Sequence, residues 1–355
     1  MGVRARSFAE RLAGEYDIHI AYRSAAKVRT IFRFFWLLLR LRPALCYVFD
    51  MGFSGVLAAG LYRGISRCRI VVDTGDAITE LSRLSGSRGP VGLWLTKLLE
   101  TFALRISHRV VVRSHLHQQS LSRRGIAAEV IPDGVDSDQF QPHPQPELRR
   151  RYGLEGVTTI GLLGSLIWNR RWQMCYGWEL IELIDRLRDL PVKGVIIGDG
   201  SGLDKLKSLC AERGLENRIV FLGRIPYDDL PPFLNLMDIC LSTQTNDGAG
   251  QVRTTGKLPL YLACGRFVLA SNVGEASRVL SSEMLVPYNG TKDTEYPARL
   301  SARVTSLLAQ PERLQQHGTS VALARKQFDY SVLTRSLRDL ISQQLAGDHQ
   351  PVTAV

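Results

Sequence analysis

Residues 246–266, NDGAGQVRTTGKLPLYLACGR, bring glycines, hydroxyl groups and cations together ahead of an apolar run, a combination that suits phosphate binding. A P-loop nucleotidase requires Gly, four residues and then Gly-Lys-Ser/Thr, because the final hydroxyl must reach a magnesium ion. Here five residues separate Gly250 from Gly256, and Leu258 stands at the hydroxyl position. The spacing therefore excludes a P-loop and leaves a more general anion site.

The same stretch predicts the start of a helix. Residues 258–263 are largely apolar, and residues 254–256 precede them. At a helix start, free backbone N–H groups and the positive end of the helix dipole face an anion, and Arg253 and Lys257 would add charge. Taken alone, the stretch is explained equally well by an ordinary capped helix with two solvated cations.

Length and composition predict a folded protein of two average domains. The chain has 355 residues, 45% of them hydrophobic, and only 15 prolines, which leaves ample material for a core. Its six cysteines are scattered without a CxxC pair or a Cys/His cluster. This usage is typical of reduced thiols in a cytosolic compartment, and it argues against a zinc site or a disulfide framework.

The charge balance is basic, and the excess lies early in the chain. The formal net charge is +11, and residues 1–140 hold 20 Lys and Arg against 12 Asp and Glu, so +8 of it lies there. Such a surface could meet anionic lipid, nucleic acid or a phosphorylated substrate. The charges are dispersed, with no basic run and no nucleic-acid motif, so nucleic acid is the least favoured partner.

The most membrane-like stretch is residues 31–41, IFRFFWLLLRL. Eleven residues with two arginines cannot span a bilayer, which requires about 20 apolar residues. We interpret the stretch as a helix packed on a sheet. The alternative is an interfacial helix on a membrane rich in anionic lipid, because residues 27–42 combine five Lys and Arg with four aromatic side chains.

Short apolar runs alternate with helix-sized segments along the whole chain. After a helix predicted over residues 2–14, strands are predicted in the first half at 17–22, 44–49, 69–74 and 109–114. A proline-rich break at 131–150 precedes strands predicted at 158–165, 192–202, 218–225, 238–243, 267–271 and 284–288. This alternation predicts an α/β fold of two Rossmann-like domains with parallel sheets facing across a cleft, and ligands beyond the carboxyl ends of the strands.

Four blocks of sequence, in order, resemble a known family. VIPDGVDSDQF (130–140) is similar to a linker signature V-I-P-N-G-V-D followed by Phe, and GLLGSLIWNRR (161–171) to a loop with phosphate-binding basic residues. IIGDGSGLDKLKSLCAERGLENRIVFLGRI (196–225) and KLPLYLACGRFVLASNVGEASRVL (257–280) follow two further blocks. Over residues 2–345 the chain resembles the retaining glycosyltransferases of family 4, which have the GT-B architecture.

The resemblance implies a division into domains. An acceptor-side domain would cover residues 1–140, and a linker would cover residues 141–153. A nucleotide-sugar-binding domain would follow at 154–325, and a C-terminal helix at 326–345 would cross back to the first domain. The family's opening strand is absent from this sequence. We therefore expect an exposed strand edge, poor packing of the first helix, and lower solubility than that of a product with an upstream extension.

The resemblance also implies a donor site. Gly164 and Ser165 begin its first loop. Ser165 replaces the family's usual Arg, so the cation at the leaving diphosphate would be Arg170 or Arg171. The other positions that would hold the nucleobase and the diphosphate are Gly223, Arg224, Ile225, Arg253, Thr255, Gly256 and Lys257. Of these cations, we assign Arg170 and Lys257 to catalysis.

The sequence departs from the family at acidic and histidine positions. The glutamate that binds the nucleotide ribose aligns with Leu260, and another, eight residues earlier, aligns with Val252; Asp247 is the nearest acidic substitute. In the first domain, the family's frequent histidine aligns near Gly75. The neighbouring Asp76 would orient the acceptor hydroxyl, and a turn residue that caps a helix is an equally supported alternative.

The resemblance implies a cytoplasmic glycosyltransferase that moves a sugar, with retention, from a nucleotide-sugar donor to a glycan or lipid-linked acceptor in bacterial surface polysaccharide synthesis. In front-face substitution the departing phosphate oxygen takes the acceptor proton, so neither a protein base nor a metal or other cofactor is required. An anionic membrane surface is a candidate partner. The alternatives are a catalytically degenerate GT-B protein that binds nucleotide sugars, and a sugar-nucleotide epimerase or hydrolase.

Overall fold

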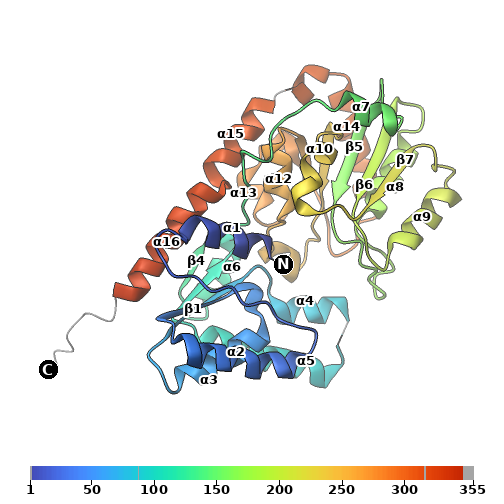
Figure 1. Cartoon of the computed structure of the whole chain (residues 1–355). Helices are drawn as coiled ribbons and strands as arrows, with labels where there is room; N and C mark the ends of the chain where they lie inside the picture. Colours follow the sequence, from blue (N-terminus) through green and yellow to red (C-terminus); the bar gives the residue numbers. More distant parts are fainter. Residues whose placement is uncertain (1, 87, 316, 347–355) are drawn as a thin grey trace. The chain divides into compact units, whose positions relative to one another are not determined.

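The chain folds into two compact units, each built on its own parallel sheet (Figure 1). This computed structural model describes residues 2–86, 88–315 and 317–346. The ranges of the first unit are Met1–Pro132, Val252–Thr254 and the chain from Tyr330, and those of the second are Asp133–Gln251 and Thr255–Asp329. Within the described part of the chain, no helix is long and apolar enough to cross a membrane.

The sheet of the first unit has four parallel strands in the order β1-β2-β3-β4. Their bounds are β1 (Leu45–Val48), β2 (Arg69–Thr74), β3 (Arg109–Val112) and β4 (Ala128–Val130). Side chains alternate between the two faces of a strand, and in β2 Ile70 and Val72 join one buried cluster while Val71 joins another. Because both faces are covered, the strand reads as a continuous apolar run.

Helices cover both faces of this sheet. They are α1 (Val3–Leu12), α2 (Lys27–Leu41), α3 (Phe53–Arg63), α4 (Ile78–Ser85), α5 (Pro90–Ile106), α6 (His115–Ser122) and α16 (Tyr330–Ala346), with a short 3-10 turn η1 (Phe49–Met51). Side chains of α3 and α5 fill the cluster around Ile70. Those of α1 and α16 fill the cluster around Val71, where Phe8 and Tyr330 meet edge to face.

Three expectations for the first unit are corrected. Residues 17–22 form no strand, because they pair with no neighbour, and their side chains are exposed. The first helix is well packed rather than loose, since Phe8 and Leu12 are only 2% and 3% exposed. The apolar stretch 31–41 lies in α2, which packs on α3, and Thr30 is the one side chain of α2 that is buried.

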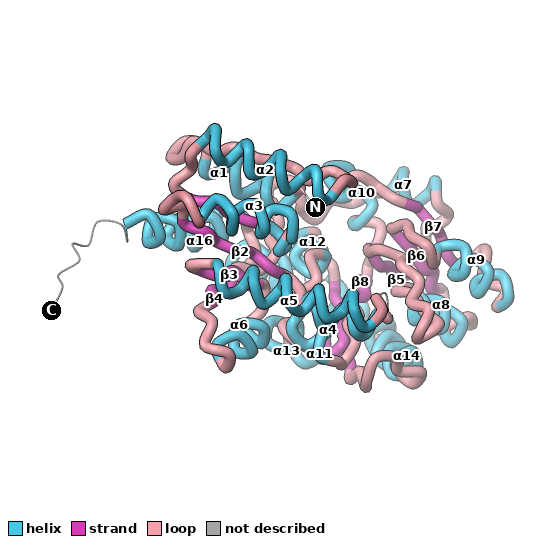
Figure 2. The backbone as a smooth tube through the Cα atoms, turned by 90° about the horizontal axis from the view of Figure 1, so that it is seen from below, coloured by secondary structure: helices cyan, strands magenta, loops and turns pink. Residues whose placement is uncertain are grey.

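The sheet of the second unit has six parallel strands in the order β10-β9-β8-β5-β6-β7. Their bounds are β5 (Thr158–Leu163), β6 (Val192–Ile197), β7 (Ile219–Gly223), β8 (Ile239–Ser242), β9 (Phe267–Ser271) and β10 (Leu285–Val286). Strand order reverses around β5, which pairs with β6 on one side and β8 on the other (Figure 2). In open α/β sheets, ligands bind beyond the carboxyl ends of strands at such a switch point.

Helices also flank the second sheet. They are α7 (Pro146–Arg151), α8 (Trp178–Arg186), α9 (Leu203–Glu212), α10 (Leu230–Leu234), α11 (Gly248–Val252), α12 (Lys257–Ala263), α13 (Ala276–Val279), α14 (Tyr296–Leu308) and α15 (His317–Gln327), with 3-10 turns η2 (Tyr227–Asp229), η3 (Ser282–Met284) and η4 (Pro311–Gln315). Every strand predicted for this half is present. The predicted α/β fold class, two Rossmann-like units with parallel sheets, is thus confirmed.

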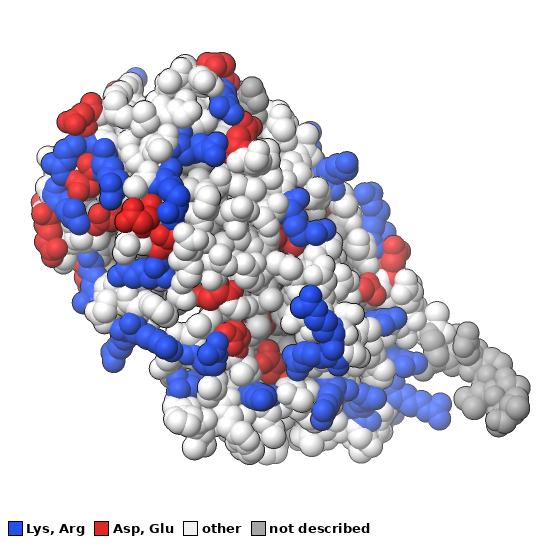
Figure 3. Space-filling view, turned by 180° about the vertical axis from the view of Figure 1, so that it is seen from behind, with Lys and Arg blue, Asp and Glu red and all other residues white. Residues whose placement is uncertain are grey.

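Charged side chains lie in separate groups at the surface (Figure 3), whereas most of the cysteines are buried. Figure 3 shows Lys and Arg side chains in several separate groups over one face of the molecule, with Asp and Glu between some of them. The six cysteines are free, and five of them are buried. Among the described residues, no group of three or more His, Cys, Asp and Glu side chains is placed to hold a metal ion.

Candidate functional site

Glycines form the walls of a site at the carboxyl edge of the second sheet. Gly198 and Gly200 follow β6 with φ values of +147° and +152°, a region that L side chains rarely adopt. A Cβ on Gly198 would lie 1.9 Å from the carbonyl oxygen of Gly164, which follows β5. The loops after β5 and β6 therefore approach backbone to backbone, and only glycine fits there.

Lys257 lies beside these loops. It opens α12, and its Nζ lies 3.4 Å from the centroid of the Tyr176 ring. A Cβ on Gly164 would lie 2.8 Å from the same ring and 3.8 Å from Nζ of Lys257. The side chain is half-buried, so a positive charge is held against an aromatic face and a glycine backbone.

Hydrogen bonds fix the elements that position this lysine. The Leu163 N–H donates to the hydroxyl of Tyr261 on α12 at 2.6 Å, which ties the helix to the end of β5. The hydroxyls of Ser242 and Thr255 are 3.1 Å apart, which ties the residues before α12 to the end of β8. The Tyr176 hydroxyl donates to a carbonyl of β8 at 2.7 Å. The aromatic ring and the helix are thus anchored to adjacent strands.

A buried carboxyl group lies behind the lysine. Glu179, in the first turn of α8, is 1% exposed, and its Oε2 accepts the N–H of Gly177 at 3.1 Å. Burial raises the pKa of Glu179, and the positive charge of Lys257 is among the smaller effects that oppose the rise. Neither Tyr176 nor Glu179 was singled out from the sequence. The one available signal was an acidic residue inside the apolar run of α8.

The predicted donor-site residues lie in different surroundings. Gly223 ends β7 with φ +67°, and its carbonyl oxygen accepts the Gly198 N–H at 2.8 Å, so it joins the glycine walls. Thr255 and Ile225 are half-buried, and the exposed predicted residues of this unit are Ser165, Arg170, Arg171, Arg224 and Gly256. The two arginines after Asn169 occupy a turn closed by a bridge between Asn169 and Met174.

Arg253 and Lys257 belong to different units, although only three residues separate them. Arg253 pairs through Nε with Oδ1 of Asp76 at 3.0 Å, and both lie in the first unit. The neighbouring Thr254 hydroxyl donates to the carbonyl of Arg113 at 2.8 Å. The two cations predicted to act together at the helix start are therefore divided, and Arg253 and Asp76 form a pair of their own.

Asp247, the nearest acidic substitute for the missing glutamates, has other partners. Oδ1 of Asp247 accepts the N–H groups of Ala249 and Gly250, at 3.1 and 2.9 Å, and so caps α11. Leu260 is 5% exposed and packs in the core. The carbonyl oxygen of Val252 accepts the hydroxyl of Ser114 at 2.5 Å.

A buried ion network lies at the carboxyl ends of the strands of the first unit. Asp73, at the end of β2, is fully buried and accepts from Nε of Arg4 at 2.8 Å and from the Tyr47 hydroxyl at 3.0 Å. Arg113 approaches its other oxygen to 3.6 Å and pairs with Asp50. Burial, helped by the charge of Asp73, raises the pKa of Tyr47. This network joins α1 to the sheet.

His117 is a buried histidine near Asp76. It is 4% exposed, and within the described residues its Nδ1 has no hydrogen-bond partner. Burial lowers the pKa of His117 to about 4, although the charge of Asp76 opposes the shift. Its imidazole is therefore neutral at neutral pH.

The first unit should lose stability as the pH falls from about 6.5 to about 4. An unfolded chain protonates His117 near pH 6.5, whereas the folded unit resists until about pH 4, so the loss is about 2 kcal/mol at pH 5. Denaturant unfolding at pH 8 and pH 5 should show a smaller difference for His117→Gln than for the wild type. Equal differences in both proteins would show that His117 is not the group responsible.

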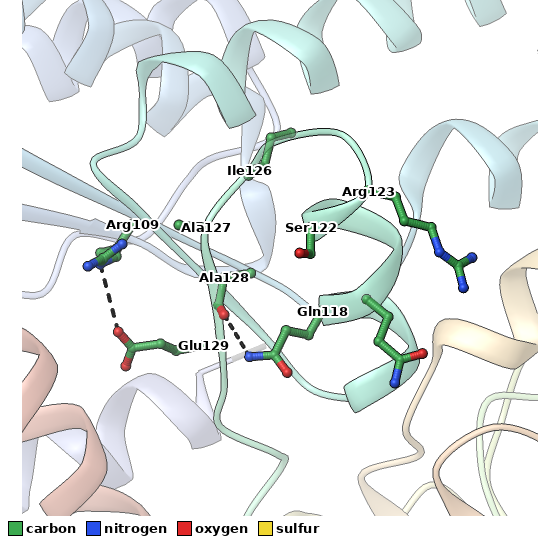
Figure 4. A pocket seen from close by; sticks show the side chains of 9 residues that line it. Arg109, Gln118, Ser122, Arg123, Ile126, Ala127, Ala128 and Glu129 are labelled. Carbon is green, nitrogen blue, oxygen red and sulfur yellow. Dashed lines mark hydrogen bonds and ion pairs between the residues drawn. The ribbon is translucent and has the colours of Figure 1, made fainter.

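A further hollow of the first unit lies away from these residues. It has a volume of about 530 Å³ and is bordered by α6 and β4 (Figure 4). Arg109 and Glu129 face each other at 3.8 Å on one side of it, and Gln118 donates to the carbonyl of Ala128 at 2.8 Å. None of the predicted site residues borders it, and Arg109 lies at the amino end of β3. We assign it no role.

Comparisons with known proteins point in one direction. Residues 157–310 match the sequence model of a family described as glycosyl transferases group 1. The GDP-mannose-dependent alpha-(1-6)-phosphatidylinositol monomannoside mannosyltransferase of Mycolicibacterium smegmatis is 31% identical over 200 residues, which is 55% of this chain and 50% of that protein. The putative colanic acid biosynthesis glycosyl transferase WcaI of Escherichia coli is 38% identical over 197 residues, 54% of this chain and 47% of that protein.

The matched stretches thus span half or less of these curated relatives. Among solved structures, Anabaena HepE in complex with UDP and glucose is similar in fold, with a TM-score of 0.68 and 19% identity over 91% of this chain and 84% of that one. The family match covers the glycine walls, Tyr176, Glu179 and Lys257. By sequence, most of the second unit therefore matches glycosyl transferases group 1, and 91% of the chain shares a fold with HepE.

Proposed function

We propose that this protein is a glycosyltransferase that transfers a sugar, with retention, from a nucleotide-sugar donor to a glycan or lipid-linked acceptor. The observation that carries the proposal is the half-buried Lys257, held over Tyr176 beside glycine-walled loops, inside the stretch that matches glycosyl transferases group 1. A diphosphate fits such a site, because backbone N–H groups and a fixed cation meet its charge. Retention follows the resemblance to family 4.

The proposed reaction is front-face substitution. The bond between the sugar's anomeric carbon and the β-phosphate oxygen breaks, and a bond to the acceptor oxygen forms on the same face. The acceptor's proton passes to the departing phosphate oxygen. Lys257 and Arg170 stabilise the charge that grows on the diphosphate, and Asp76, paired with Arg253, orients the acceptor hydroxyl. With protein cations in these roles, the proposed reaction uses no metal or other cofactor.

The relatives suggest the classes of donor and acceptor. The mycobacterial relative is named as GDP-mannose-dependent and acts on a phosphatidylinositol monomannoside, while HepE binds UDP and glucose. WcaI is named for colanic acid biosynthesis. We extend these classes to this chain: a UDP- or GDP-sugar donor, a lipid-linked or glycan acceptor, and a role in bacterial surface polysaccharide synthesis at the cytoplasmic side of a membrane.

A panel of UDP-, GDP-, ADP- and dTDP-sugars tests the proposal. Titration calorimetry should find at least one donor that binds, and the same donor should be turned over with a lipid-linked or glycan acceptor. Binding of a nucleotide sugar without turnover on any acceptor would favour the alternative, a degenerate binding protein. Absence of binding by every donor would refute the proposal.

Replacing Tyr176 with Leu should weaken the binding of that donor about tenfold, because a cation over an aromatic ring contributes on the order of 1 kcal/mol or more and also fixes the position of Lys257. Tyr176→Phe keeps the ring and loses only the hydroxyl bond to β8, so its donor affinity should stay near that of the wild type. Equal weakening in both variants would mean that the ring is not what positions the lysine.

A further inference from the structure

Exposed apolar side chains are concentrated in the first unit. Of the large hydrophobic residues that are exposed in the described chain, all but Ile167 belong to it. On α5 they form one stripe with spacings of three to four residues: Val91, Trp94, Leu95, Leu98 and Phe102. This spacing puts them along a single side of the helix. Trp94 is 64% exposed and Val91 is 78% exposed.

Exposed apolar residues also lie on two further helices: α3 packs against α5, and α2 packs against α3 (Figure 2). A Cβ on Gly60 of α3 would lie 2.9 Å from the Phe102 ring, so α3 and α5 are in close contact. The Ser54 hydroxyl of α3 donates to the carbonyl of Lys27 at 3.1 Å, at the start of α2. Exposed apolar residues on or just after these helices are Val28, Phe32, Trp36, Leu61 and Ile65. We call these residues and the α5 stripe the three-helix face.

The exposed charged residues on the three helices are all cations. Neither α2 nor α3 contains an acidic residue. α5 contains only Glu100, and both of its oxygens accept N–H groups at the start of α4, at 2.9 and 3.1 Å. Exposed cations on these helices or directly after them include Arg29, Arg33, Arg40, Arg42, Lys97 and Arg105. A partner that fits this face is apolar at its centre and negative at its edge.

We propose that the three-helix face docks this protein on an anionic lipid bilayer, with the α5 stripe inserted among the acyl chains. Cations at the rim meet lipid phosphates, and salt weakens that attraction. Insertion of Trp94 and Leu98 among the acyl chains adds an apolar contribution to the binding free energy, and salt does not screen this contribution. Binding therefore has two parts, which two sets of substitutions separate. The inference goes beyond sugar transfer, because it requires neither donor nor acceptor.

Co-sedimentation of the full chain with vesicles tests this inference. Vesicles of 70% phosphatidylcholine and 30% phosphatidylglycerol are compared with pure phosphatidylcholine, at 50 mM and 500 mM NaCl. The wild type should bind the anionic vesicles at low salt and keep part of that binding at high salt. Trp94→Glu/Leu98→Glu should bind at least tenfold more weakly at both salt concentrations. Arg29→Glu/Arg33→Glu should lose only the salt-sensitive part of binding, so that its binding at low salt falls to the level that the wild type keeps at high salt.

Ile167→Glu is the matched control, because Ile167 is 66% exposed and lies in the second unit. It should bind vesicles like the wild type. Circular dichroism checks that each variant is folded, which is expected since the replaced side chains are at the surface. Wild-type binding by Trp94→Glu/Leu98→Glu, or no vesicle binding by the wild type, would overturn the proposal. So would a dimer in sedimentation equilibrium that this variant converts to a monomer, because a second copy would then cover the face.

Discussion

Lys257→Met should lower kcat by about two to three orders of magnitude, while the unfolding midpoint stays close to that of the wild type. Removing one preorganised group that stabilises charge in a transition state costs a factor of this size. The side chain is half-buried over Tyr176 and forms no part of the apolar core, so its loss should leave the fold intact. Lys257→Arg keeps the charge and should restore part of the rate.

Lys205→Met is the control for this variant. Lys205 lies on α9 with its Nζ 4.9 Å from the centroid of the Trp168 ring, so it too is a lysine over an aromatic side chain of the second unit, but it is exposed. Its replacement should leave kcat unchanged. Steady-state kinetics with the donor found in the panel give the comparison. If Lys257→Met and Lys205→Met were equally active, the assignment of the diphosphate to Lys257 would be wrong.

Arg170→Ala should also reduce kcat if the exposed turn after Asn169 delivers the second cation to the diphosphate. Arg171→Ala, one residue along the same turn, separates the two candidates. If replacing one of these two arginines lowers kcat without raising KM, that arginine stabilises charge that is present only in the transition state.

The sequence predicts those elements whose signal is local. Strands such as β3 and β9 hold continuous apolar runs because both faces of each sheet are covered, and such runs can be recognised without knowing the neighbours. Residues 17–22 alternate in polarity as an edge strand does, yet a strand exists only where a partner strand accepts its hydrogen bonds. The stretch 31–41 is apolar enough to be core, but composition does not reveal which side of α2 meets α3.

The candidate site shows the same limit. Lys257 could be singled out because residue type and position in a loop are visible in sequence, and Gly164 and Gly223 because the chain resembles family 4 at those positions. The position of the Tyr176 ring next to the lysine depends on how the segment before α8 packs against α12. No pattern of residue types in the sequence encodes that packing. Arg253 is close in sequence to Lys257, yet hydrogen bonds made by Val252 and Thr254 group it with the first unit, and spacing along the chain does not show this.

Arg4→Met should lower the free energy of unfolding of the first unit by about 3 to 5 kcal/mol. Asp73 is fully buried, and losing its closest cation leaves a carboxylate with a desolvation cost that Tyr47 and Arg113 only partly offset. The Arg4 guanidinium also donates to the carbonyl oxygens of Ile131 and Pro132, at 2.8 and 2.5 Å, so α1 would lose its polar attachment to the sheet.

Arg6→Met, two residues along α1, provides the control for this change. Arg6 is exposed and lies 3.9 Å from Glu10, an arrangement worth at most about 0.5 kcal/mol. Hydrogen exchange of the β2 amides, followed by mass spectrometry, reports the stability of this unit separately from the other. Arg4→Met/Asp73→Asn should recover part of the loss, because the second change removes the charge that the first leaves unpaired. Without such a recovery, the effect of Arg4 would come from its packing against Phe8, over whose ring it lies at 4.9 Å, and not from its charge.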